Sequence, residues 1–201
     1  MIPIETIYAE ILDKEKLDHI YRVRVKAEIN PAPGQFISII FSGRTEIPLN
    51  IGSYRDGIID LYIESEKLYN MIPDTGGYIL VKGPLGKGID IERGKRLIGI
   101  AYRSWIYDLK YILENAEKRG IDVRVKCIEC TSKYKEPDTL ENSQIIASVP
   151  REYIGKLPRN SLILARWVKM NCMLGVCGVC RIGNTIPCIQ GPFIRVDQVV
   201  E

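Results

Sequence analysis

The chain has 201 residues, of which 46% are hydrophobic and 26% charged, and its formal net charge is +3. This composition is typical of a globular protein with a well-developed core, and so small a charge, with no basic stripe among aromatic residues, gives no reason to expect nucleic-acid binding. No apolar run has the length of a membrane span and the amino terminus lacks signal-peptide features, so we expect a cytoplasmic protein with no membrane span.

Residues 1–91 have the pattern of an antiparallel barrel. Residues 21–29 alternate apolar and charged side chains, as expected for a strand with one buried face. Further strands are expected at residues 35–41, 57–63 and 77–81, with turns rich in glycine and proline between them. Several short strands at regular spacing predict a small β-barrel.

The pattern changes after residue 92. Residues 97–101 form an apolar run typical of a buried parallel strand. A helix is expected to follow, with Ser104 as its N-cap and Gly120 at its end. Further strands are expected at residues 121–128, 143–148 and 161–165. The order strand, helix, strand predicts a right-handed α/β unit with a parallel sheet over residues 92–165.

Four of the six cysteines lie in the last thirty residues, at Cys172, Cys177, Cys180 and Cys188. The first three follow the C-x4-C-x2-C spacing of plant-type ferredoxins, which suits a [2Fe-2S] cluster. Gly183 and Asn184 predict a two-residue hairpin turn that brings Cys188 to Cys180. The pattern therefore predicts a [2Fe-2S] module over residues 166–201, with these four cysteines as its ligands.

Other interpretations of the cysteines stay open. Four thiolates also make a structural zinc site, although such sites usually pair two C-x2-C knuckles. Disulfides would need an oxidising compartment, for which the sequence gives no evidence. Cys127 and Cys130 form a second C-x2-C, but on a strand residues three apart point to opposite faces. We therefore predict that this second pair consists of small buried side chains that bind no metal.

Residues 151–181 carry six basic side chains and one acidic side chain. Cations near an anionic cluster would stabilise its reduced form. A solvated face or a docking surface for an acidic partner would explain the same charges.

Three segments carry a resemblance to a known family. Residues 33–36 read P-G-Q-F, residues 83–89 read G-P-L-G-K-G-I, and residues 170–193 contain the cysteine run and a C-I-Q-G-P-F tail. These segments resemble the ferredoxin-reductase superfamily, and within it the electron-transfer subunits of B-type dihydroorotate dehydrogenase. The resemblance implies an α+β multidomain fold: a β-barrel like the family's FAD domain, an α/β unit like its nucleotide domain, and a [2Fe-2S] module.

The resemblance also implies an FAD site on the barrel. The residues at the family's flavin positions are Pro48, Leu49 and Asn50, followed by the strand Leu61, Tyr62 and Ile63. The family's phosphate-binding arginine is replaced by Ile47, so we predict weak or substoichiometric FAD binding. Residues 102–105 contain no glycine where the family has a glycine-rich nicotinamide loop, so we predict that NAD is not an efficient acceptor.

The function that the resemblance implies is electron transfer, with no catalytic residues in this chain. A flavin-containing dihydroorotate dehydrogenase catalytic subunit, in a heterotetramer, would oxidise dihydroorotate in pyrimidine biosynthesis. Its electrons would pass through the cluster of this chain to an external acceptor. Two alternatives are a reductase component of another multi-subunit oxidoreductase and a zinc-stabilised scaffold subunit.

Overall fold

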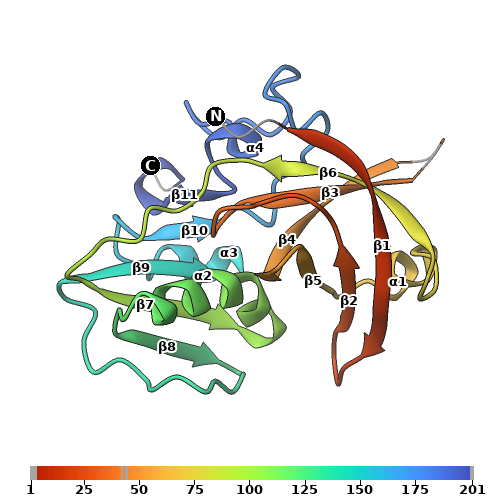
Figure 1. The fold of residues 1–201 in the computed structure, drawn as a ribbon. Helices are drawn as coiled ribbons and strands as arrows, with labels where there is room; N and C mark the ends of the chain where they lie inside the picture. Colours follow the sequence, from red (N-terminus) through yellow and green to blue (C-terminus); the bar gives the residue numbers. More distant parts are fainter. Residues whose placement is uncertain (1–3, 42, 44, 200–201) are drawn as a thin grey trace.

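The computed structural model describes residues 4–41, 43 and 45–199 (Figure 1). The first half of the chain is a closed barrel with the strand order β1-β2-β5-β4-β3-β6. These strands are β1 (Glu5–Lys16), β2 (Tyr21–Lys26), β3 (Phe36–Phe41), β4 (Thr45–Arg55), β5 (Ile58–Ile63) and β6 (Tyr78–Leu85). All their pairings are antiparallel, which confirms the predicted barrel.

Alternation along each strand fills the barrel. On β2, Val23 and Val25 are fully buried in the core, whereas Arg24 lies outside and pairs with Asp60 at 3.0 Å. After β5, Ser65 begins a short helix, α1 (Glu66–Met71), and its hydroxyl accepts a hydrogen bond from the Leu68 amide at 3.2 Å.

The second half of the chain forms a five-stranded sheet in the order β11-β10-β9-β7-β8. Its strands are β7 (Arg96–Tyr102), β8 (Val123–Ile128), β9 (Ser143–Ser148), β10 (Leu162–Leu164) and β11 (Phe193–Arg195). The first four are parallel, as predicted, and β11 pairs antiparallel with β10. Strand β11 lies within the predicted C-terminal module, so that segment also completes the sheet.

Helix α2 (Ile106–Lys118) covers one face of this sheet (Figure 1). Its Leu109 and Leu113 pack onto β7, where a Cβ at Gly99 would lie 3.2 Å from Leu113 Cδ2. The helix ends as predicted, with Gly120 at a φ of +74°.

The start of α2 differs from the prediction. A 3₁₀ turn, η1 (Arg103–Trp105), precedes the helix, and Trp105 is the N-cap residue. Ser104 does not cap the helix because its hydroxyl donates instead to Glu64 of the barrel at 2.5 Å. A contact between the two halves of the chain therefore replaces the expected local one.

The last part of the chain contains short elements joined by turns: α3 (Arg151–Ile154), α4 (Pro187–Gln190) and η2 (Val196–Gln198). In the part of the chain that the structure describes, no helix is long and apolar enough to span a membrane.

Candidate functional site

The four C-terminal cysteines are free and lie together in two pairs. Cys172 is within hydrogen-bonding reach of Cys177, and Cys188 is within reach of Cys180. The first pair is open to solvent, with Cys177 exposed and Cys172 partly buried, whereas Cys180 and Cys188 are both buried. The structure therefore gathers the four predicted ligands into two pairs.

The backbone of the first cysteine loop points its amides inward. Met173, Gly175 and Gly178 have φ values of +56°, +78° and +69°. With this conformation the Leu174 amide lies 3.5 Å from Cys172 Sγ, and the Gly175 amide faces Cys188. Amides that converge in this way form a concavity that stabilises an anion.

The surroundings shift the pKa values of Cys172 and Cys188 in opposite directions. The Leu174 and Cys177 amides lower the pKa of Cys172 to about 6. Burial, followed by the Cys180 thiol, raises the pKa of Cys188 to about 12. The solvent-facing end therefore favours the thiolate, which is the ligand form of cysteine, and the buried end favours the thiol.

The predicted hairpin brings Cys188 back to Cys180. Ile182 and Thr185 exchange backbone hydrogen bonds of 2.9 and 2.8 Å around Gly183, whose φ is +52°. Cys188 then lies on α4 and packs with Cys180 against Met173, Phe36 and Leu85.

The donor set fits a two-iron cluster. A [2Fe-2S] centre takes two thiolates on each iron, and the chain offers two pairs of thiols beside inward-facing amides. Among residues 4–41, 43 and 45–199, no three His, Cys, Asp or Glu side chains are gathered as ligands of a single ion.

The predicted flavin residues are only partly brought together. Pro48, Leu49, Asn50 and Tyr62 line one cavity of 190 Å³ between the barrel and the α/β unit. The side chains of Leu61 and Ile63 point into the barrel core instead. Cofactor sites usually measure about 300–1,000 Å³. This cavity is smaller than that range, but Pro48, Val168 and Met170 also line an adjoining cavity of 340 Å³.

One tyrosine in the wall of this cavity, Tyr62, is held in an aromatic stack. The Tyr62 ring stacks on Tyr107 of α2, with centroids 4.0 Å apart and planes 14° apart. The Tyr62 ring also lies against the backbone of Gly52, where a Cβ would come within 2.3 Å of it. Burial raises the pKa of Tyr62, and the nearby Asp60 carboxylate raises it further.

Asp108 on α2 lines this cavity and joins the two halves of the chain. Asp108 accepts hydrogen bonds from Asn50 of the barrel at 3.0 Å and from Ser148 of β9 at 2.7 Å. The Arg166 guanidinium donates to the same carboxylate at 2.6 Å. Sequence reasoning missed this role, because an acidic residue in the first turn of a helix is already explained by the helix dipole.

Arg166 belongs to this junction. Its guanidinium also pairs with Glu64 at 2.7 Å and lies 4.3 Å from the centre of the Trp105 ring. Because only 29% of the side chain is exposed, Arg166 contributes less to the surface charge near the cysteines than its position in the sequence suggests.

The cavity and the cysteine site adjoin each other. Phe36, Val168 and Met170 line the cavity, and the same three side chains pack around Cys180 and Cys188. The predicted flavin positions and the predicted cluster ligands are therefore separated by a shared layer of packed side chains.

A second cavity, of 910 Å³, lies at the carboxyl ends of β7 and β8, where α/β folds bind nucleotides. Glu64, Arg103, Ser104, Glu129 and Cys130 are among its walls. Arg103 stands where a glycine-rich loop would be needed, and its guanidinium is held by Glu129 at 2.6 Å.

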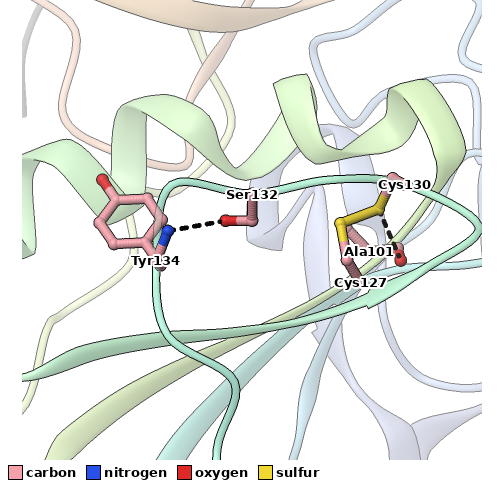
Figure 2. The surroundings of a disulfide bond; sticks show 5 residues. All are labelled: Ala101, Cys127, Cys130, Ser132 and Tyr134. Carbon is pink, nitrogen blue, oxygen red and sulfur yellow. Dashed lines mark hydrogen bonds between the residues drawn. A yellow bond between two sulfur atoms is a disulfide. The ribbon is translucent and has the colours of Figure 1, made fainter.

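Cys127 and Cys130 form a disulfide beside this cavity (Figure 2). The prediction that they lie on opposite faces of a strand is wrong, because β8 ends at Ile128. Glu129 then adopts a φ of +55°, which returns Cys130 to Cys127. The two sulfurs are bonded to each other and both residues are partly exposed, so they are not the small buried side chains that the sequence predicts.

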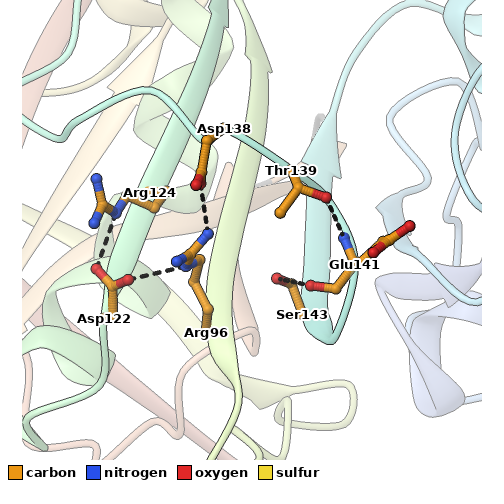
Figure 3. A network of polar contacts seen from close by, with 7 residues as sticks. All are labelled: Arg96, Asp122, Arg124, Asp138, Thr139, Glu141 and Ser143. Carbon is orange, nitrogen blue, oxygen red and sulfur yellow. Dashed lines mark hydrogen bonds and ion pairs between the residues drawn. The ribbon is translucent and has the colours of Figure 1, made fainter.

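An ion-pair network lies at the amino-terminal ends of β7 and β8 (Figure 3). Two of its members, Arg96 and Asp122, also line a cavity of 680 Å³. Arg96 pairs with Asp122 at 2.9 Å and with Asp138 at 2.8 Å, and Arg124 also pairs with Asp122 at 3.0 Å. Hydrogen bonding from Arg124, followed by Arg96, keeps the pKa of Asp122 below its usual range. Because its charges satisfy one another, this network has a structural role, joining the polar loop 131–142 to the sheet.

No family model matches the chain. It is 26% identical to a probable electron transfer subunit of dihydroorotate dehydrogenase B (NAD(+)) from Thermoplasma acidophilum, over 83% of this chain and 80% of the relative. It is 27% identical to the protein of the same description from Methanopyrus kandleri, over 99% of this chain and 94% of the relative. A third such protein, from Pyrococcus horikoshii, is 24% identical, over 92% and 87% of the two chains.

Solved structures share the fold. An NADH-dependent reduced ferredoxin–NADP oxidoreductase superposes with a TM-score of 0.69 at 18% identity, over 95% of this chain and 88% of that chain. The FAD apo form of a ferredoxin reductase of carbazole 1,9a-dioxygenase superposes with a TM-score of 0.60 at 18% identity, over 77% and 60% of the two chains. The predicted resemblance is therefore confirmed: the chain is similar to electron-transfer subunits of B-type dihydroorotate dehydrogenase and has the fold of the ferredoxin reductases.

Proposed function

We propose that this chain is an electron-transfer subunit that carries electrons from a flavin-containing dihydroorotate dehydrogenase catalytic subunit to an external acceptor. Cys172, Cys177, Cys180 and Cys188 hold a [2Fe-2S] cluster, which supplies one-electron chemistry when bound. The chain contributes no acid, base or nucleophile to the oxidation of dihydroorotate. That reaction belongs to the partner.

One observation carries this proposal: two pairs of free thiols lie beside inward-facing amides, directly against the barrel–sheet junction. The concavity formed around Met173 and Gly175 compensates the negative charge of a four-thiolate centre. The buried pair, Cys180 and Cys188, is fixed by packing on Phe36 and Met173. The other pair faces solvent, from which a partner can approach.

The surface around the cysteine loop supports a docking role. Leu174, Val176, Val179 and Ile189 are 48%, 82%, 50% and 44% exposed, and we call these four the cysteine-loop patch. An apolar group of this kind beside a redox centre is suited to a protein partner, because burying it is favourable only when another surface covers it. Docking here brings the partner close to the solvent-facing thiols.

We assign no step of the transfer to FAD. The 190 Å³ cavity beside Pro48 and Tyr62 is smaller than cofactor sites usually are. Tyr62, which lines this cavity, is held in a stack with Tyr107 of α2. The proposed route therefore runs from the partner's flavin to the cluster of this chain.

The experiment that tests the function is purification of the chain together with its catalytic partner, followed by analysis of iron, acid-labile sulfide, zinc and flavin. The expected result is two irons and two sulfides per chain and bleaching of the visible absorption when dihydroorotate is added. Zinc without iron would contradict the proposal and favour the scaffold alternative. If iron is present but dihydroorotate does not reduce it, the cluster assignment stands and the proposed catalytic partner is wrong.

A further inference from the structure

The disulfide between Cys127 and Cys130 lies at the carboxyl ends of the parallel strands β7 and β8 (Figure 2). Cys127 lies on β8 in register with Ala101 of β7, near the carboxyl ends of both strands. The two Cα atoms are 5.2 Å apart. Open α/β sheets bind their ligands at this edge, so the pair is placed where small molecules are expected to arrive.

Only one of the two residues lines the cavity at this edge. Cys130 forms part of the wall of the 910 Å³ cavity, next to Glu129 and Thr131, and Cys127 does not. Both cysteines are partly exposed and also pack against the apolar core beneath α2. A cavity of this volume admits a small molecule. Cys130 is therefore the cysteine that a reagent entering the cavity meets first.

A purely structural role explains this disulfide poorly. It joins residues only three positions apart, and the chain entropy removed by a disulfide increases with the length of the loop that it closes. The turn between the cysteines already has another support, because Glu129 pairs with Arg103 at 2.6 Å.

The surroundings also accommodate the reduced pair. Cys130 Sγ lies 3.7 Å from the carbonyl oxygen of Ala101. A sulfur in a disulfide has no proton to donate, whereas a thiol can donate to a carbonyl. Reduction therefore gives Cys130 a hydrogen-bond partner that the oxidised form cannot use.

From this placement we propose that Cys127 and Cys130 are a redox-active dithiol/disulfide site that reacts with a small dithiol through the 910 Å³ cavity. One thiolate of the reductant attacks Cys130 Sγ, the Sγ–Sγ bond breaks, and Cys127 leaves as a thiolate that takes a proton from solvent. The second thiolate of the reductant attacks its own sulfur in the mixed disulfide and releases Cys130, which is also protonated. Two electrons pass to the pair, and the reductant becomes a disulfide.

This site is independent of the proposed electron transfer, because it uses none of the four C-terminal cysteines. The first test is made on the full chain purified with its partner. The complex is mixed with reduced dithiothreitol, quenched with acid, alkylated and mapped by mass spectrometry, which resolves the 127–130 peptide from the other cysteines. We expect the native protein to be reduced within about tenfold of the rate of the urea-unfolded chain and to reoxidise with oxidised dithiothreitol.

Native reduction that is no faster than global unfolding would overturn the proposal, because it would mean that reagents reach the disulfide only in the unfolded chain. A pair that stays reduced in oxidised dithiothreitol would also overturn it. Amide hydrogen exchange gives an independent readout. Reduction should raise exchange in the segment around Glu129 and leave the barrel strands unchanged.

Two single variants test which sulfur is attacked. Cys127→Ser leaves the cavity-lining Cys130 as the free thiol, and Cys130→Ser leaves Cys127. With oxidised glutathione as the probe, we expect the adduct on Cys130 to form at least tenfold faster than the adduct on Cys127. Equal or reversed rates would contradict attack through the cavity.

Discussion

The ring of Tyr62 on barrel strand β5 stacks on the ring of Tyr107 on helix α2, with centroids 4.0 Å apart. This stack joins the two halves of the chain beside Pro48 and Leu49, at the predicted flavin positions. Aromatic stacking contributes about 0.5–1.5 kcal/mol beyond the burial of the rings. Tyr62 lines the cavity, so a flavin that needs more room there has to displace the stack, which reduces its net affinity.

We therefore expect FAD to bind weakly, at well below one FAD per chain after gel filtration. Ile47 lines an adjoining cavity of 340 Å³ together with Pro48, and Ile47→Arg places there the phosphate-binding cation that the predicted FAD site lacks. A hydrogen bond to a charged group contributes about 1.5–3 kcal/mol, so the variant should bind FAD at least about tenfold more tightly. Titration calorimetry with FAD measures both proteins. Stoichiometric FAD in the unmodified chain after dialysis would show that the cavity opens readily.

The Asp108 carboxylate should be important for stability. Its side chain is 13% exposed and accepts hydrogen bonds from Asn50, Ser148 and Arg166. Asp108→Ala leaves these donors without their partner and should lower the free energy of unfolding by about 2–4 kcal/mol. Denaturant unfolding monitored by circular dichroism measures the change.

The matched control is Glu117→Ala, on the same helix. Glu117 pairs with Lys133 at 2.9 Å, but both side chains are more than half exposed. Loss of an exposed pair should change stability by no more than about 1 kcal/mol. Equal effects of the two variants would mean that the junction network does not hold the barrel against the α/β unit.

The fold could be predicted from the sequence where the pattern is local. The period-2 alternation of residues 21–29 indicates a barrel strand, and the apolar run 97–101 indicates a buried parallel strand. Strand β4 was harder to recognise, because Pro48 and Asn50 interrupt its pattern. In the structure β4 is held by its pairing with β3 and β5, which its local sequence does not indicate.

The candidate site could be predicted only in part, because much of it depends on distant contacts. The spacing of the four C-terminal cysteines was enough to identify them as a group. The contacts between the barrel and the α/β unit could not be predicted, since Glu64 and Arg166 are 102 positions apart in the sequence. The disulfide was also missed, because it depends on Glu129 adopting a left-handed backbone that glutamate rarely adopts.

The ligand assignment predicts different outcomes for the two groups of cysteines. Cys177→Ser and Cys180→Ser each remove one member of a pair and should strongly reduce iron content and visible absorption. Cys127→Ser and Cys130→Ser should retain both, because these residues lie at the carboxyl ends of β7 and β8. Iron analysis and absorption spectra of the four variants, each purified with the partner, decide the matter. Full iron and colour in a Cys177→Ser, Cys180→Ser double variant would refute the assignment.

Docking through the cysteine-loop patch predicts that a charge placed there weakens the complex. Val176 is 82% exposed, and Val176→Glu should weaken association with the catalytic subunit by about tenfold or more, because the carboxylate would be buried in the interface. The control is Tyr8→Glu, since Tyr8 is 74% exposed on barrel strand β1. Surface plasmon resonance compares the two variants. Similar affinities for both would place the interface elsewhere.

The last prediction is that NAD is not an efficient acceptor for the complex. A dinucleotide site brings the pyrophosphate against helix amides through glycines, because side chains block that approach. Here residues 102–105 are Tyr, Arg, Ser and Trp, and Arg103 already pairs with Glu129 at 2.6 Å. The volume of the 910 Å³ cavity would be sufficient, but Glu64 and Glu129 in its wall already occupy the guanidinium groups of Arg166 and Arg103 that could bind phosphate.

Steady-state assays with dihydroorotate as the donor test this prediction by comparing NAD with quinone analogues and redox dyes. We expect rapid reduction of the dyes and slow, non-saturating reduction of NAD. Arg103→Gly, Trp105→Gly provides a matched variant, because it removes the two bulky side chains at the sheet edge and should raise the rate with NAD if steric exclusion is the cause. Rapid, saturable NAD reduction by the unmodified complex would overturn the prediction, because it would mean that the pyrophosphate is bound by other residues.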